Sequence, residues 1–185
     1  MTNRRLRRVL GFLPLALVLI VPTTASAAPN ACAAANSAPT EVSADQLEHT
    51  VLCLVNRERT SRGLSRLRSN RRLERAARGH SRHMVDRKFF SHDSPGGASL
   101  LERVRKRGYN SPRGTTVGEN IAWGSGSYAT PAGIVESWMR SPGHRANILH
   151  RSFREIGVGV VLGAPRPVAG GSPAATYTTD FGARR

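Results

Sequence analysis

The sequence predicts an α+β domain, with helices in its first part and an antiparallel sheet in its last part. Up to about residue 149, apolar residues recur at helical spacing, with capping residues before several of the runs. From Ile156 onward, apolar residues alternate with glycine or polar residues, which is the period of a strand. Helices and strands that are segregated in this way favour a layered α+β domain.

Two long amphipathic helices are expected near the start of the domain. Ser43 and Gln46 stand three residues apart, as in a capping box, so the first helix should run over about residues 44–62. A second helix is expected over about residues 70–88, with one apolar face. His80 lies on that face, which favours a histidine in the core over a ligand-binding one.

The remaining elements are shorter. They are a basic helix over 98–107, a Pro/Gly-rich loop over 109–118, a helix that begins at Thr130-Pro131, a turn or two over 144–149 after a break at Pro142-Gly143, and strands over 156–162 and 175–181.

Residues 1–27 have the features of a secretory signal peptide. Four arginines precede an apolar stretch of 13 residues, and Ala25-Ser26-Ala27 is a small-x-small cleavage site. A membrane-spanning helix needs ~20 apolar residues, so no transmembrane anchor is expected after signal removal; an uncleaved anchor is the alternative. The expected product is secreted, with a flexible lead-in over 28–42 and one domain over 43–182.

Cys32 and Cys53 are the two cysteines of the chain. In an exported protein, two cysteines suggest one disulfide. Cys53 lies off the apolar stripe of the first helix, which suits a tether to the lead-in better than a place in the core. The alternative is two unpaired thiols.

The formal net charge is +16, and removing the signal with its four arginines and no acids leaves +12. Such a surface attracts anionic partners, including the anionic polymers of a cell wall. The basic run over residues 66–78 contains no interleaved aromatic residues, so specific nucleic-acid binding is not expected.

Three residues with functional side chains stand out, each inside a distinctive short motif. His92 lies in Phe-Ser-His-Asp-Ser-Pro, Glu119 in Gly-Glu-Asn-Ile-Ala-Trp, and His144 in Ser-Pro-Gly-His-Arg-Ala-Asn. They lie 27 and 25 residues apart, so only the fold can bring them together. Two imidazoles and a carboxylate can bind a metal, relay a proton or hold a polar ligand.

These motifs, with others in the same order, resemble the CAP superfamily, also called the SCP domain, over about residues 45–182. This superfamily comprises cysteine-rich secretory proteins, antigen 5 and plant pathogenesis-related-1 proteins. The further matching segments are Leu54-Val55-Asn56-Arg57-Glu58-Arg59, Ala76-Ala77-Arg78-Gly79-His80-Ser81, Trp138 through Leu149, and Gly157-Val158-Gly159.

The resemblance implies an α-β-α sandwich in which His92, Glu119 and His144 converge in an open surface cleft. Many eukaryotic relatives carry a fourth residue there, an acid about three residues after the tryptophan that matches Trp138. In this chain Ser141 occupies that position. Ser141 is therefore a further candidate cleft residue, and the absent acid weakens any function that needs four ligands.

Two imidazoles and a carboxylate match the ligand set of a catalytic zinc site with water as the fourth ligand. His92 and His144 are the candidate metal ligands, and zinc is the divalent metal to test as a cofactor. Glu119 would either join them or hold one imidazole in a single tautomer. The alternative is a hydrogen-bonded polar cluster that shapes the cleft without a metal.

Two functions follow. The first is a secreted, non-enzymatic module whose cleft holds a small ligand, a lipid or a cell-envelope component. The second is a metal-assisted hydrolase, most simply a peptidase, with Glu119 as the candidate catalytic base acting on zinc-bound water.

Overall fold

The computed structural model describes residues 32–185, so the predicted signal segment over 1–27 lies outside the described residues. The helices are α1 (Ala44–Thr60), α2 (Arg71–Arg87), α3 (Leu100–Lys106), α4 (Pro131–Arg140) and α5 (Pro142–Ile148), with short 3-10 helices at Gly126–Ala129 and Ala169–Gly171. The strands are β1 (Arg68–Ser69), β2 (Thr115–Ser125), β3 (Glu155–Leu162) and β4 (Ala174–Arg184).

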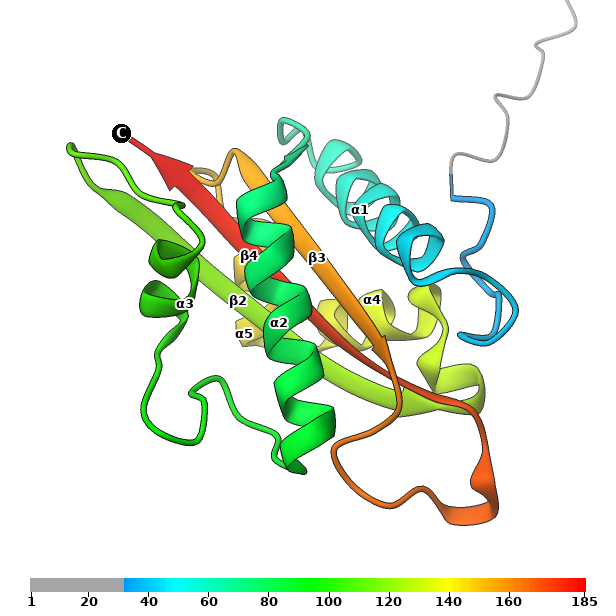
Figure 1. Cartoon of the computed structure of the whole chain (residues 1–185). Coiled ribbons are helices and arrows are strands. Elements are labelled where there is room, and N and C mark those ends of the chain that lie inside the picture. Colours follow the sequence, from blue (N-terminus) through cyan, green and yellow to red (C-terminus); the bar gives the residue numbers. More distant parts are fainter. Residues whose placement is uncertain (1–31) are drawn as a thin grey trace, which may run out of the picture.

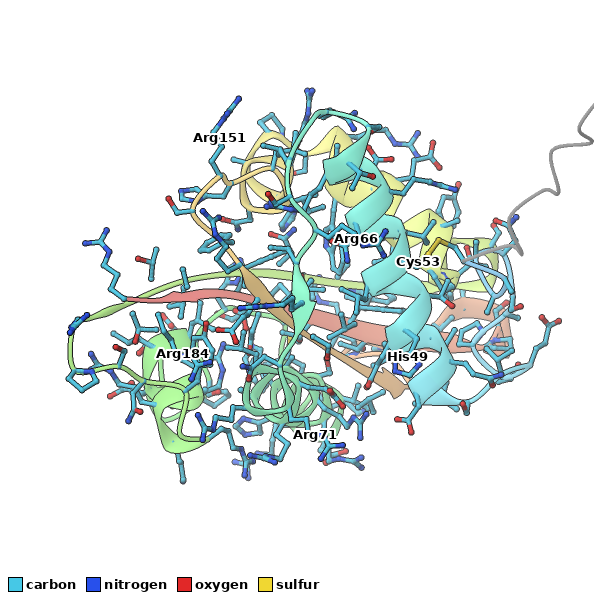
Figure 2. The ribbon with its side chains drawn as sticks, turned by 90° about the horizontal axis from the view of Figure 1, so that it is seen from above. His49, Cys53, Arg66, Arg71, Arg151 and Arg184 are labelled. Carbon is cyan, nitrogen blue, oxygen red and sulfur yellow. A yellow bond between two sulfur atoms is a disulfide. The ribbon has the colours of Figure 1, made fainter. Side chains whose placement is uncertain are left out.

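The domain has three layers, with the sheet in the middle. Helices α2 and α3 cover one face, and α1, α4 and α5 cover the other (Figures 1 and 2). This arrangement confirms the predicted α+β class and the α-β-α sandwich. Among residues 32–185, no helix combines the length and the apolar character needed to cross a bilayer.

The sheet has the strand order β1-β3-β4-β2. Strand β4 is antiparallel to both β2 and β3, whereas the two-residue β1 pairs in parallel with β3. The loop expected over residues 109–118 is wrong in its last part, because the chain enters β2 at Thr115. Strand β2 lacks a clear alternation of apolar and polar residues, because several of the positions that face a helix layer hold glycine or polar residues of the candidate site.

The predicted starts of α1 and α4 are confirmed, whereas α5 begins at Pro142 and includes the Pro142-Gly143 pair at which a break was expected. The Ser43 hydroxyl accepts a hydrogen bond from the Gln46 amide, and the Gln46 side chain accepts one from the Ser43 amide, which completes the capping box. Thr130 caps α4, with Pro131 in its first turn. Helix α4 ends at Arg140, and Ser141 is both its C-cap and the N-cap of α5.

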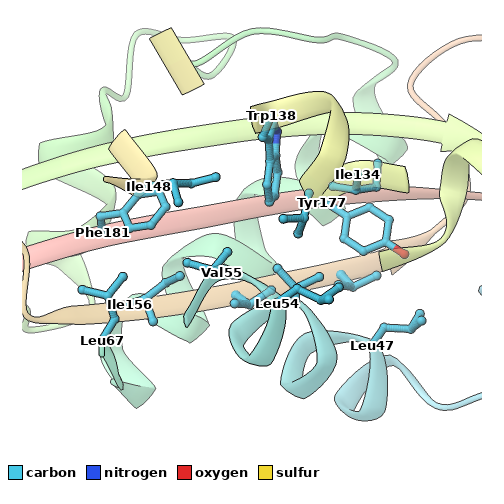
Figure 3. Packing of buried hydrophobic residues seen from close by; sticks show 14 of the residues in the cluster. Leu47, Leu54, Val55, Leu67, Ile134, Trp138, Ile148, Ile156, Tyr177 and Phe181 are labelled. Atoms are coloured by element: carbon cyan, nitrogen blue, oxygen red, sulfur yellow. The ribbon is translucent and has the colours of Figure 1, made fainter. Parts of the chain in front are cut away.

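The larger apolar core lies between the sheet and the helices α1, α4 and α5 (Figure 3). Its fully or almost fully buried residues include Leu47, Val51, Leu54, Val55, Ile134, Trp138, Ile148, Ile156, Tyr177 and Phe181. Each such side chain contributes about 1.5–3 kcal/mol of hydrophobic stabilisation. The indole N–H of Trp138 donates to the Ile121 carbonyl at 3.2 Å, so α4 is joined to β2 by a polar contact inside this core.

The predicted disulfide between Cys32 and Cys53 is confirmed. It joins the start of the described chain to α1 across a sequence separation of 21 residues, and a loop of this length corresponds to about 3 kcal/mol in the chain-entropy account. The Ala132 amide also donates to the Ala35 carbonyl at 2.8 Å. The segment before α1 is therefore tied to both α1 and α4.

On the opposite face, two glycines of β3 let α2 lie directly on the sheet. A Cβ atom added at Gly157 would lie 2.0 Å from the Glu74 amide nitrogen, and one added at Gly159 would lie 2.0 Å from the Arg78 amide nitrogen. Both neighbours are helix backbone, which cannot move aside as a side chain can. The glycines of the Gly157-Val158-Gly159 motif thus fix the distance between α2 and the sheet.

Replacing Gly159 with alanine should therefore destabilise the fold strongly. Overpacking costs about 1–3 kcal/mol when side chains can adjust, and here the helix backbone itself must move, so we expect a loss of about 3 kcal/mol or more in urea unfolding. Gly143→Ala is the matched control, because a Cβ there meets nothing within 4 Å and the residue lies in α5. Equal stability of the two variants would contradict this account of the packing.

Candidate ligand-binding site

Glu119 is the central residue of the candidate site. It lies in β2, directly opposite Asp180 of β4, which in turn lies opposite Gly157 of β3. Because paired residues point to the same face, and a Cβ at Gly157 would point into α2, the Glu119 side chain points toward the α2/α3 layer. Its side chain is only 2% exposed.

Two cationic or hydrogen-bonding groups bind this buried carboxylate. His92 donates from Nδ1 to Glu119 Oε1 at 2.8 Å, and Arg103 of α3 donates from Nη2 to Glu119 Oε2 at 2.6 Å. The other terminal nitrogen of Arg103 donates to the carbonyls of His92 and Ala98, at 2.7 and 3.0 Å. Arg103 thus holds both the carboxylate and the loop that carries His92.

The pKa values of Glu119 and His92 are shifted in opposite directions. Burial alone would raise the pKa of Glu119, but the hydrogen bond from His92 and the charge of Arg103 hold that pKa below its ordinary value. The hydrogen bond to Glu119, opposed in part by burial, raises the pKa of His92 above its ordinary value. Since Nδ1 carries the donated proton, Nε2 is the ring atom that His92 can offer to a ligand.

His144 reaches the same region from the other side of β2. The Asn120 side chain donates to the His144 carbonyl at 3.0 Å, and the Asn147 side chain donates to the Glu119 carbonyl at 3.0 Å. These bonds attach α5 to β2 beside Glu119. Burial, together with the positive charge of His92, lowers the pKa of the His144 imidazole.

Gly118 allows this close attachment of α5. A Cβ atom there would lie 2.8 Å from the Phe153 ring and 3.0 Å from Asn147 Oδ1. The glycine of the Gly-Glu-Asn motif is therefore needed for packing, whereas the glutamate and asparagine that follow it point to opposite faces of the strand.

The three residues singled out in the sequence are thus brought together around β2, His92 by a direct bond and His144 through α5. We call His92, Glu119, Arg103 and His144 the His92 cluster. The His92 side chain is 55% exposed, so the cluster offers an imidazole to solvent. Ser141 lies at the junction of α4 and α5, and its hydroxyl makes no capping bond there.

Two residues of the site were not found from the sequence. Arg103 was seen only as part of a basic helix, and Asp180 only as part of an alternating strand. Asp180 is fully buried, and neither of its carboxylate oxygens accepts a hydrogen bond from the residues over 32–185. Burial and the nearby Glu119 raise the pKa of Asp180 well above its ordinary value. The available signal was a lone acid within a strand in which no other residue before Arg184 carries a charge.

The cluster does not fit a three-ligand zinc site. Both carboxylate oxygens of Glu119 are already bonded, one to His92 and one to Arg103. Within residues 32–185 no three His, Cys, Asp or Glu side chains are grouped to hold a metal ion. His92 Nε2 and the His144 ring remain as the two donors that a metal would find here, which is fewer than a catalytic zinc site uses.

His80 is a core histidine, as its place on the apolar face of α2 predicted. It is 1% exposed, and its Nε2 lies 2.9 Å from the Ser91 carbonyl. Burial lowers its pKa to about 4, although the nearby Glu119 opposes that shift. A neutral imidazole must use Nε2–H to bond a carbonyl, so His80 holds the start of the His92 loop on α2.

Comparisons with known proteins identify the family and the fold of the chain. Residues 52–176 match the model of the cysteine-rich secretory protein family, CAP. The uncharacterised protein YkwD of Bacillus subtilis is 41% identical over 141 residues, which is 75% of this chain and 52% of YkwD. The chain thus spans about half the length of that relative.

Solved structures show the same fold. An extracellular protein of Bacillus anthracis that contains an SCP domain is 27% identical, with a TM-score of 0.59 over 78% of this chain and 44% of that one. An outer surface protein of Borrelia burgdorferi is 17% identical, with a TM-score of 0.63 over 78% of this chain and 97% of that one; this likeness concerns the fold.

Replacing Glu119 with glutamine should lower the pKa of His92, because the bond that raises it is to a carboxylate. In the wild type, the His92–Glu119 pair stabilises the fold fully at pH values below the unfolded histidine pKa of ~6.5. This stabilisation is lost as the pH rises through the raised pKa of His92 in the folded state. NMR titration of the His92 ring measures the shift directly. Glu136→Gln removes the same charge from exposed α4, where Glu136 pairs with Arg140, and should leave His92 unchanged. An unaltered His92 titration in Glu119→Gln would contradict the assignment.

Proposed function

Since the chain belongs to the cysteine-rich secretory protein (CAP) family, we propose that it is an exported, non-enzymatic binding module for a component of the cell envelope. The His92 cluster is the proposed binding site, and the ligand is a small molecule or polymer segment with an anionic or polar group. The observation that carries the proposal is the exposed imidazole of His92, held in one orientation by a buried, charge-neutralised carboxylate.

This arrangement suits recognition because the cluster is ordered before a ligand arrives. Arg103 neutralises Glu119 and holds the His92 loop by two backbone carbonyls. The imidazole therefore loses little further freedom on binding, and such preorganisation lowers the cost of association. When His92 is protonated, it offers a charged donor from Nε2, which suits a phosphate or carboxylate oxygen.

The charge of the chain supports an anionic partner. A net +12 after signal removal creates a field that attracts anionic wall polymers over the whole surface. Arginines project from several elements, among them Arg66, Arg71, Arg151 and Arg184 (Figure 2). In the proposed function this field concentrates the chain at the envelope, and the His92 cluster then recognises a specific group.

Export is supported by two independent features. The Cys32–Cys53 disulfide is characteristic of oxidising compartments, and the first 27 residues have the sequence of a signal peptide. The B. anthracis protein with the same fold is described as extracellular. The proposed location is therefore outside the cytoplasmic membrane, in contact with the wall.

Binding to isolated cell walls tests the proposal. The purified chain should co-sediment with walls that retain their anionic polymers, and less with walls from which these polymers are stripped. His92→Ala should weaken binding about tenfold or more, because a hydrogen bond to a charged group is worth about 1.5–3 kcal/mol. His49→Ala is the control, since His49 is an exposed histidine of α1 (Figure 2).

Varying the salt concentration separates the general charge attraction to the wall from the specific contact made by His92. Raising ionic strength should weaken the general attraction in both variants but should keep the difference between His92→Ala and the wild type. Equal binding of His92→Ala, His49→Ala and the wild type at every salt concentration would mean that the cluster does not bind the wall.

The alternative, a metal-assisted hydrolase, rests on the free Nε2 of His92 and on His144, whose pKa is lowered by burial. Dialysis against zinc followed by metal analysis decides it. We expect no tightly bound metal at a 1:1 ratio, because the two imidazoles lack a third protein ligand. Stoichiometric zinc that is lost in both His92→Ala and His144→Ala, together with loss of peptide cleavage, would replace the binding module with the hydrolase.

A further inference from the structure

A hollow of about 360 Å³ lies between α2, α3 and the loop over residues 94–98. Its size is at the lower end of the range of small-molecule sites, which is roughly 300–1,000 Å³. Much of its wall is carbon, contributed by Ala76 and Gly79 of α2 and by Pro95 and Ala98 of the loop. Among the described residues of the His92 cluster, only Arg103 also borders this α2–α3 hollow, so the two places are separate.

Gly79 is a glycine that neither the backbone nor the packing requires. It lies inside α2 with an ordinary helical conformation, and a Cβ added there would meet only Arg107 Nη2, at a comfortable 3.5 Å. Glycine inside a helix lowers its stability relative to alanine. Gly157 and Gly159 are needed because the backbone of α2 packs directly against them. Gly79, in contrast, faces open space, and that space is the α2–α3 hollow.

Two unpaired cations stand at the rim of this hollow. Lys106 and Arg107 border it, both are exposed, and neither forms an ion pair with an acid among residues 32–185. Glu102, the acid of the same rim, is bound by the Ser99 amide at 2.8 Å in the capping box of α3. Arg103 is already paired with Glu119. Glu102 keeps its negative charge in this cap, so the exposed rim carries the positive charges of Lys106 and Arg107 against one negative charge, and its net charge is positive.

Two residues that border the hollow each carry one buried nitrogen that is closed off from solvent, so a ligand in the hollow does not reach it. Both His80 and Arg103 border the hollow, and His80 Nδ1 and Arg103 Nε have no hydrogen-bond partner within residues 32–185. Because His80 Nε2 donates to the Ser91 carbonyl, Nδ1 is an acceptor, whereas Arg103 Nε–H is a donor. Unpaired buried polar atoms of this kind are uncommon in folded proteins.

We propose that the α2–α3 hollow binds a small carboxylate with a short apolar body. The carboxylate pairs with Lys106 and Arg107 at the rim, and the carbon atoms fill the space beside Gly79. The volume and the carbon-lined wall of the hollow favour a ligand with a short apolar body, and the unpaired cations favour a negatively charged group. This site is independent of the His92 cluster and of the envelope-binding function proposed for it.

A chain-length series tests the proposal. Straight-chain carboxylates from butanoate to decanoate are titrated into the purified chain by calorimetry. Affinity should rise by up to about fourfold per methylene group and level off once the hollow is filled. The alcohol of the best-binding length should bind more weakly, because it lacks the charge that Lys106 and Arg107 recognise.

Gly79→Leu is the decisive variant, because the leucine side chain fills the hollow. It should lower affinity at least tenfold while keeping or raising the melting temperature, since leucine is the better helix former. Lys106→Gln combined with Arg107→Gln should weaken carboxylate binding and leave the alcohol unchanged. His92→Ala should bind the carboxylates as the wild type does. Absence of saturable binding in the wild type, unchanged binding in Gly79→Leu, or loss of binding in His92→Ala would each overturn the proposal.

Discussion

The buried carboxylate of Glu119 is the constraint on which the arrangement of this face depends. An ionised acid buried between a sheet and a helix layer costs several kcal/mol of desolvation unless it is paired and hydrogen-bonded. Arg103 and His92 supply that pairing, and each comes from a segment far from β2 in the sequence. The need to neutralise one side chain therefore places α3 and the His92 loop against the sheet. Asp180 lies opposite Glu119, and burial together with the charge of Glu119 raises the pKa of Asp180 well above its ordinary value.

The same stretch of β2 organises the other face as well. Glu119 points to the α2/α3 layer, whereas its neighbour Asn120 points to the α5 side, where it binds the His144 carbonyl. Since successive residues of a strand face opposite ways, one Gly-Glu-Asn motif attaches helices to both sides of the sheet. The ligand-facing groups thus meet at β2, which is an edge strand of the sheet and is bordered by the His92 loop on one side and by α5 on the other.

Local signals predicted most of the helices, because capping boxes, Thr-Pro starts and Pro-Gly breaks act over a few residues. The capping box at Ser43 and the break before α5 are of this kind. The alternation of β3 and β4 was equally visible. Strand β2 was missed because its identity comes from long-range pairing with β4 rather than from its own pattern. Arg103 and Asp180 were missed for a related reason: their partner is Glu119, and nothing in the spacing of three residues on three elements shows that they meet.

Arg103 is the point at which the two proposed sites touch, and this has a physical consequence. Its terminal nitrogens bind Glu119 and the His92 loop, while its side chain also borders the α2–α3 hollow. A ligand in the hollow that displaced the guanidinium would also move the carboxylate that holds His92, so binding at one place would change affinity at the other by the same factor in both directions. A ligand that pairs with Lys106 and Arg107 and leaves Arg103 in place would show no such coupling. Because the guanidinium also neutralises Glu119, its displacement would leave a charge buried without a partner, and the fold therefore favours the second, uncoupled mode.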